Sequence, residues 1–62
     1  MKKFNCIWFD DEIKMEEVIE AIDKEEATIK FQKYLVAYGE GGNLWNYPHL
    51  EIIRQEATIE EI

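Results

Sequence analysis

The period of the hydrophobic positions changes within the first half of the chain, between Ile19 and Ala27. Up to Ile22 the apolar residues fit a strand, whereas beyond Asp23 they recur at helical intervals, at Ala27, Phe31, Tyr34, Leu35 and Tyr38. Asp23 is a good N-cap, and Glu26 stands three residues later as the second half of a capping box. The sequence therefore predicts a helix from about Lys24 to Tyr38 that ends before Gly39.

Two apolar segments precede this helix. Residues 4–9 are rich in aromatic and β-favouring side chains and end at Asp10 and Asp11, which suit a turn, so they predict a first strand. Residues 12–22 have two interpretations: an amphipathic helix, or a strand that pairs with the first, with a bulge around Glu16 and Glu17. We favour the strand, because the first strand needs an antiparallel partner and a capping box would interrupt a running helix.

Beyond the helix, residues 39–43 predict a glycine-rich loop, which residues 44–48 continue with aromatic side chains. Residues 49–55 predict a third strand, and residues 57–62 a short continuation of undetermined type. The prediction for residues 1–62 is a single α+β domain in β-β-α-β order. It consists of an antiparallel hairpin plus a third strand, with one helix on one face of the sheet.

Such a sheet would be apolar on both faces, although one helix can cover only one of them. We expect the second face to carry large apolar residues, namely Ile7, Phe9, Val18, Ile22 and Ile53. Monomers seldom leave an apolar patch of this size in water, so this face is the predicted interface of a homo-oligomer. The alternative is that Ile59, Ile62 and the aromatic loop fold back over it.

The small size of the chain also favours association. A domain of 62 residues buries a small core, and stability at this size usually needs a disulfide, a metal or a partner. Cys6 is the only cysteine, so no disulfide can form within the chain. With His49 as the only histidine, the chain cannot build a closed structural zinc site either.

The charge balance narrows the class of partner. Seven basic residues stand against 14 acidic ones, for a net charge of −7. We therefore expect no direct binding to nucleic acid or to an anionic membrane, and a protein partner with a basic surface becomes plausible. Solubility alone would also explain the acidity. With no predicted signal or membrane-spanning segment, we expect a cytoplasmic protein.

The side chains that could carry catalysis do not form a convincing set. Asp10, Asp11 and Glu12 lack the spacing of a calcium loop and suit a solvated turn. Cys6 is expected to be a buried, inert thiol, and His49 has no recognisable catalytic partner, since the chain contains no serine. We expect a protein that is not an enzyme and that has no cofactor or metal.

Binding is the better hypothesis. Leu44, Trp45 and Tyr47 follow glycines and resemble interface anchors, although they could equally pack over the sheet. The carboxylates of Glu16, Glu17 and Glu20 could dock a basic cleft. In length, acidity and element order the chain resembles small accessory proteins of phages and mobile elements, many of which inhibit host enzymes. The expected function is inhibition of a larger protein, such as a host defence or nucleic-acid enzyme; the alternative is a subunit that homo-oligomerises through its sheet face.

Overall fold

The computed structural model describes residues 1–10, 12–38 and 49–62. Its elements are β1 (Lys2–Asp10), β2 (Ile13–Ala21), α1 (Lys24–Tyr38), α2 (Leu50–Glu56) and β3 (Thr58–Glu61). The strands form one antiparallel sheet in the order β2-β1-β3. The α+β class is confirmed, and so are the N-terminal hairpin and the bounds of the first helix. The observed order, however, is β-β-α-α-β.

The hairpin of β1 and β2 is regular over its whole length. Its register runs without interruption from Asp10 opposite Ile13 to Lys2 opposite Ala21. The predicted bulge around Glu16 and Glu17 is therefore wrong. Glu17 keeps its place on the apolar side of β2, opposite the buried Cys6, and is itself half-buried. A long side chain can occupy this position because its stem packs while its carboxylate reaches the strand edge.

The capping box predicted at the start of α1 is present in a shifted form. The Glu26 amide donates to Asp23 Oδ1 at 2.8 Å, and the Ala27 amide donates to the Asp23 carbonyl at 3.1 Å. The Glu26 carboxylate reaches back to the amide of Ile22 at 3.0 Å, one residue before the N-cap. The bond to the Glu26 amide satisfies one of the amides that a helix start leaves without an intrahelical partner, and the Ala27 bond is the first turn of α1 itself. Together with the Ile22 bond, they fix the turn from β2 into α1.

The core lies between the sheet and α1. The helix contributes Ala27, Phe31 and Leu35, which are almost fully buried at the spacing of four that the sequence predicts. The strands contribute side chains from one face only, and α2 adds one residue. The remaining core members are Phe4, Cys6, Trp8, Ala21, Ile53 and Ile59.

The predicted third strand at residues 49–55 is wrong, because Leu50–Glu56 is the helix α2. Leu50, Ile53 and Ala57 recur at intervals of three and four, and all three are at least partly buried. Ile53 is fully buried, whereas Ile52, which a strand would have turned toward α1, is 37% exposed. Arg54 also bonds Glu51 one turn earlier. The apolar pattern of this short segment fits both periods, and packing against α1 selects the helix.

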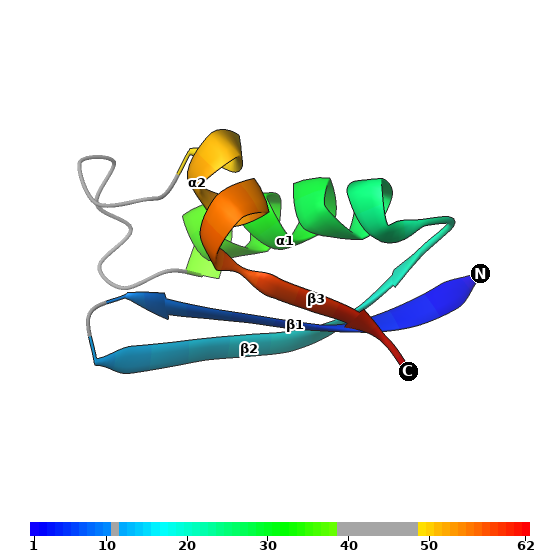
Figure 1. Cartoon of the computed structure of the whole chain (residues 1–62), viewed down its shortest axis with the longest axis horizontal. Coiled ribbons are helices and arrows are strands. Elements are labelled where there is room, and N and C mark those ends of the chain that lie inside the picture. The colour runs from blue at the N-terminus through cyan, green and yellow to red at the C-terminus, as the bar shows by residue number, and fades with distance from the viewer. Residues whose placement is uncertain (11, 39–48) are drawn as a thin grey trace.

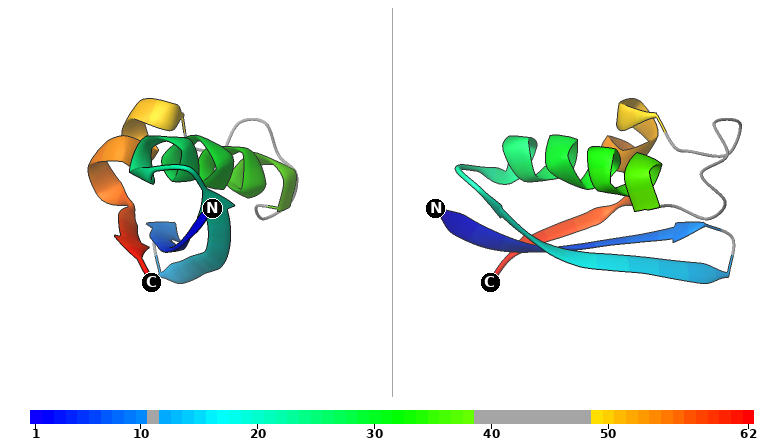
Figure 2. Two further views of the ribbon diagram at one scale, coloured as in Figure 1. Left: turned by 90° about the vertical axis from the view of Figure 1, so that its right-hand side faces the viewer. Right: turned by 180° about the vertical axis from the view of Figure 1, so that it is seen from behind.

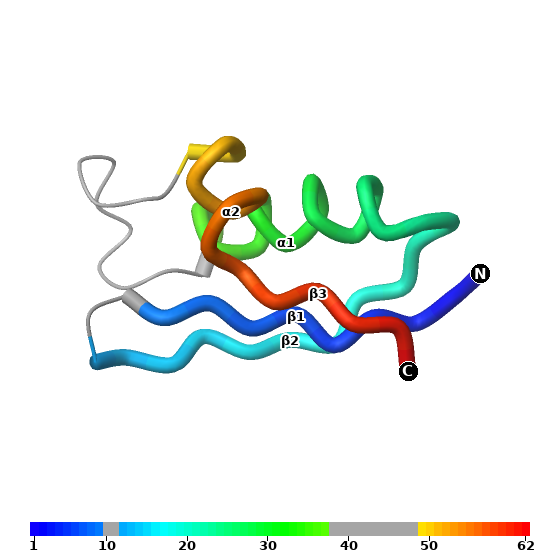
Figure 3. Tube along the Cα trace, in the orientation of Figure 1, coloured from blue at the N-terminus to red at the C-terminus, as the bar shows by residue number. Residues whose placement is uncertain are grey.

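The third strand is β3, within the C-terminal segment whose type the sequence left open. Ala57 has extended backbone angles and its amide closes α2 on the Ile53 carbonyl at 3.0 Å. Ile59 then points into the core opposite Cys6, and Thr58 lies opposite Ile7. Figure 3 shows β3 running beside β1, with both chain ends at the same end of the sheet.

The two helices lie on the same side of the sheet, as both views in Figure 2 show. α1 contacts all three strands and also α2. The indole of Trp8 donates to Glu56 at 3.3 Å, and Arg54 bonds Glu25, so α2 is tied to both β1 and α1. None of the described helices covers the opposite face of the sheet (Figure 1).

Candidate interaction surface

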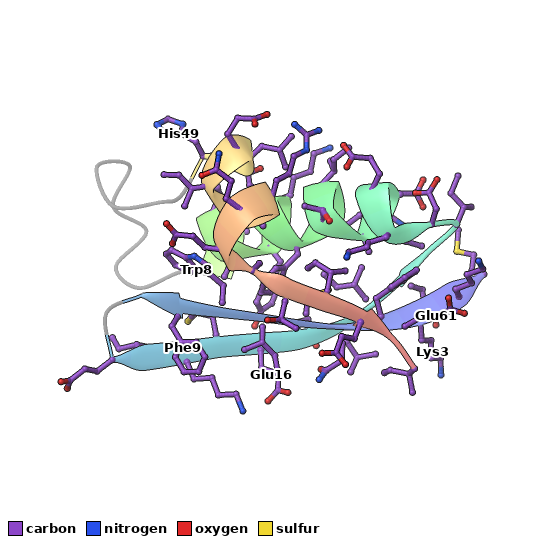
Figure 4. The ribbon with its side chains drawn as sticks, viewed as in Figure 1. Lys3, Trp8, Phe9, Glu16, His49 and Glu61 are labelled. Atoms are coloured by element: carbon purple, nitrogen blue, oxygen red, sulfur yellow. The ribbon has the colours of Figure 1, made fainter. Side chains whose placement is uncertain are left out.

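The uncovered side of the sheet follows from the hairpin register. Alternate residues of a strand point to opposite faces, so the buried Phe4, Cys6 and Trp8 assign their neighbours to the other side. Figure 4 shows Lys3, Phe9 and Glu16 pointing away from the helices and Trp8 pointing toward them. We call this side the open face. Its residues are Lys3, Asn5, Ile7 and Phe9 from β1, Lys14, Glu16, Val18 and Glu20 from β2, and Thr58 and Glu60 from β3.

An apolar stripe crosses the open face diagonally. Phe9 and Ile7 are neighbours along β1, and Ile7 lies diagonally across from Val18 on β2, because its direct partner there is Glu16. Phe9 is 57% exposed and Val18 50% exposed, while Ile7 between them is half-buried. Single exposed apolar residues are ordinary, but these three are neighbours in the register on a sheet face that no described helix covers, so they form a small apolar patch.

Glu16 lies beside this stripe and has two polar neighbours. It accepts a hydrogen bond from Asn5 Nδ2 at 3.2 Å and forms an ion pair with Lys14 at 3.4 Å. Both neighbours lie on the open face, Asn5 on β1 and Lys14 on the same strand as Glu16. Asn5 and Lys14 are not among the binding residues that the sequence predicts. The alternation of the hairpin was the signal that could have placed them beside the apolar residues.

Four of the five residues predicted for a homo-oligomer interface lie on the open face or at its end, and Ile53 does not. Ile7, Phe9 and Val18 lie on the open face, and Ile22 follows the end of β2 with 61% of its surface exposed. Ile53 does not belong to this set, because α2 buries it completely between the helices and the sheet. On β2, the open face carries the charged Lys14, Glu16 and Glu20 and the single apolar Val18. The patch is therefore smaller than the sequence predicts.

The predicted partner-binding residues do not lie together. Leu44, Trp45 and Tyr47 lie outside the described residues. Glu16 and Glu20 are exposed on the open face, whereas Glu17 lies on the opposite side of β2 and bends to the strand edge, where it accepts from the Val18 amide at 3.1 Å. These three carboxylates thus do not present a single surface.

Several other carboxylates are engaged in ion pairs. Glu26 pairs with Lys30 at 3.4 Å, Glu61 pairs with Lys2 at 3.9 Å, and Glu25 and Glu51 share Arg54. These pairs lie on α1, on α2 and at the end of the sheet. Over the described residues, these paired carboxylates are therefore spread over several elements and do not gather on one face.

The structure gives Cys6 the environment of an inert thiol. The side chain is fully buried, and its Sγ donates weakly to the Phe4 carbonyl at 3.8 Å. Burial, with a smaller contribution from the negative charge of Glu17, raises the pKa of the thiol from 9.0 to about 11. At neutral pH the thiolate that a nucleophile or metal ligand requires is scarce. His49 lies at the outer end of the helical layer, at the start of α2 (Figure 4).

Within residues 1–10, 12–38 and 49–62, no three histidine, cysteine, aspartate or glutamate side chains gather in a way that could hold a metal ion. In the same part of the chain, neither helix has the length and apolar character needed to cross a membrane. Comparisons with protein-family models, with curated proteins and with solved structures find no match to this chain.

Proposed function

We propose that this chain is a small non-enzymatic interaction protein that binds and inhibits a larger protein through its open face. The observation that carries the proposal is the apolar stripe of Phe9, Ile7 and Val18 on a sheet face that no described helix covers. Protein interfaces are built in this way, with an apolar centre and a polar rim. The buried and protonated Cys6 supports the non-enzymatic part of the proposal.

The rim of the stripe indicates the kind of partner. Glu16 accepts a hydrogen bond from Asn5 and pairs with Lys14, so its carboxylate is oriented beside the stripe, where a basic group of a partner can meet it. With a net charge of −7, the chain favours a partner with a basic surface. A nucleic-acid enzyme, including one of a host defence system, offers such a surface, whereas free nucleic acid and anionic membranes do not attract this chain.

The test is capture of the partner by the immobilised protein, followed by an activity assay of the purified partner. Phe9→Asp and Val18→Asp should each weaken binding by about 30-fold or more, the effect expected of an interface anchor. Ile52→Asp is the matched control, because it adds the same charge at an exposed isoleucine of α2, away from the open face. This control should bind and inhibit like the wild type.

Three results would overturn parts of the proposal. Equal binding by Phe9→Asp, Val18→Asp and wild type would exclude the open face. Loss of binding in Trp45→Ala alone would move the binding surface to residues 44–47. A partner that is captured with full affinity but retains its activity would exclude inhibition and leave the subunit alternative.

A further inference from the structure

The outer edge of β2 offers a second surface, whose backbone groups can be assigned from the register. In antiparallel sheets, alternate residues direct their N–H and C=O groups to opposite sides of the strand. The Lys3 carbonyl accepts from the Ile62 amide at 2.8 Å, so Lys3 points its groups toward β3. Its partner Glu20 therefore points its groups away from β1, out of the sheet. The same holds for every second residue of β2, which includes Lys14, Glu16 and Val18.

Side chains occupy this edge at its C-terminal half. Lys30 of α1 donates to the Glu20 carbonyl at 2.8 Å, and Glu17 accepts from the Val18 amide at 3.1 Å. Both bonds satisfy groups that an edge strand would otherwise offer to another strand. Covering of this kind is how natural sheets prevent edge-to-edge pairing.

The N-terminal half of the same edge is different. Within the described residues, no hydrogen bond occupies the outward N–H and C=O groups of Lys14 and Glu16. Both residues are exposed. Among the described residues, side chains thus occupy this edge near the end of β2, and none occupies it over Lys14 and Glu16.

We propose that this free half-edge pairs antiparallel with the same half-edge of a second copy of the chain. The proposal does not depend on the function proposed above, because it concerns the edge of the sheet and not its open face. The argument for a second copy, rather than an unrelated strand, is charge complementarity. The two exposed residues that carry the free groups, Lys14 and Glu16, have opposite charges.

A two-fold axis restricts the register of such a pair. If the axis passes through a residue of β2, the backbone N–H and C=O groups that point out of the sheet face the same groups of the other copy. If the axis passes between two residues, they face groups that already point toward β1, and no hydrogen bonds form. An axis at Lys14 opposes two lysines, and an axis at Glu16 opposes two glutamates. An axis at Met15 places Lys14 of each copy opposite Glu16 of the other, on the same side of the sheet. Opposite charges in this position stabilise a strand pair, and like charges destabilise it.

This register joins the two three-stranded sheets into one continuous sheet. The open faces of both copies then lie side by side, and the side chains of Lys14 and Glu16 form a four-charge cluster across the junction. Only a short stretch of strand is buried, well below the area of a stable dimer, so the pairing is weak. We expect a dissociation constant of about 10 to 1,000 µM.

Sedimentation equilibrium of the full chain, from about 10 µM to about 2 mM, tests the proposal. Lys14→Glu and Glu16→Lys each turn both charge pairs into repulsive ones, and each should weaken self-association about tenfold or more. An equimolar mixture of these two variants restores both attractive pairs, so it should associate at least as strongly as the wild type. The double variant Lys14→Glu/Glu16→Lys should also recover association. Lys3→Glu, with the same charge change outside the paired segment, is the matched control and should leave association unchanged.

The mixture controls for effects of net charge and of misfolding. Both single variants keep a net negative charge, so bulk electrostatics do not draw them together. A variant that failed to fold would not be rescued by mixing. The proposal is wrong if the wild type remains monomeric at 2 mM, if the single variants associate like the wild type, or if mixing restores nothing. Association that is abolished by Phe9→Asp but unaffected by the charge reversals would place the contact on the open face instead.

Discussion

Replacement of Ile53 and Ile52 by alanine, one at a time, decides between the two interpretations of residues 49–55. In the structure Ile53 is fully buried in α2 and Ile52 is 37% exposed. In the strand interpretation the roles are reversed, because Ile52 would face α1 and Ile53 the open face. The two variants remove the same atoms from adjacent positions, so each controls for the other.

The expected magnitudes differ widely. Ile53→Ala loses the transfer free energy of the removed methyl and methylene groups and leaves a cavity, which together amount to about 2–5 kcal/mol. Ile52→Ala loses a smaller contact and gains helix propensity, so its net effect should be below about 1 kcal/mol. A domain of 62 residues has a total unfolding free energy of only about 3–9 kcal/mol, so Ile53→Ala removes a large part of it.

Urea unfolding followed by circular dichroism measures both variants. With a slope of about 1 kcal/mol per molar, Ile53→Ala should lower the midpoint by about 2 M or more, and Ile52→Ala by less than about 1 M. If Ile53→Ala does not fold, Ile53→Val should still lower the unfolding free energy by about 0.5–1.5 kcal/mol. A greater loss for Ile52→Ala than for Ile53→Ala would refute the helix and restore the strand.

Three further predictions concern single contacts. Because burial raises the folded-state pKa of the Cys6 thiol to about 11, the thiol stabilises the fold below pH 9, and this stabilisation is lost as the pH rises to 11. Urea unfolding at a series of pH values should show this loss for the wild type and not for Cys6→Ala. Rapid labelling of native Cys6 by a thiol reagent at neutral pH would contradict its burial. Asp23→Ala should lower the unfolding free energy by about 1 kcal/mol and Asp23→Ser by much less, and equal losses in thermal unfolding would exclude the cap. Glu56→Ala should cost about 0.5–1.5 kcal/mol through the lost bond to Trp8, whereas Glu56→Gln keeps an acceptor and should be near neutral; equal effects would exclude that bond.

The parts of the fold that the sequence predicts correctly have local signals. The capping box at Asp23 and Glu26 forms among neighbouring residues, and the apolar spacing of α1 extends over several turns. The hairpin follows from two adjacent apolar segments separated by the acidic residues Asp10 and Asp11, which suit a turn. Residues 49–55 have no such signal, because seven residues with apolar positions at 50, 52 and 53 fit either period. Only the packing of Ile53 in the core distinguishes the helix from the strand.

The candidate surface could be predicted to a similar extent. Ile7, Phe9 and Val18 were assigned to one face from alternation alone, and the regular register of β1 and β2 keeps them there. The protection of the β2 edge could not be predicted. It depends on Lys30, which reaches Glu20 only because α1 packs back over the sheet. Whether a side chain bonds the outward backbone groups of β2 therefore depends on tertiary packing and not on the local sequence.

The open face and the free half-edge share Glu16, so their two proposed interactions should oppose each other. A basic group of the partner that binds the Glu16 carboxylate would compete with Lys14 of a second copy, since a carboxylate beside Asn5 and Lys14 has few free acceptor positions left. By linkage, self-pairing should then weaken partner binding to the same extent. Partner affinity measured at rising concentrations of the chain should fall for the wild type and fall much less for Lys14→Glu, which self-pairs more weakly. A constant affinity for both would show that the two surfaces act independently.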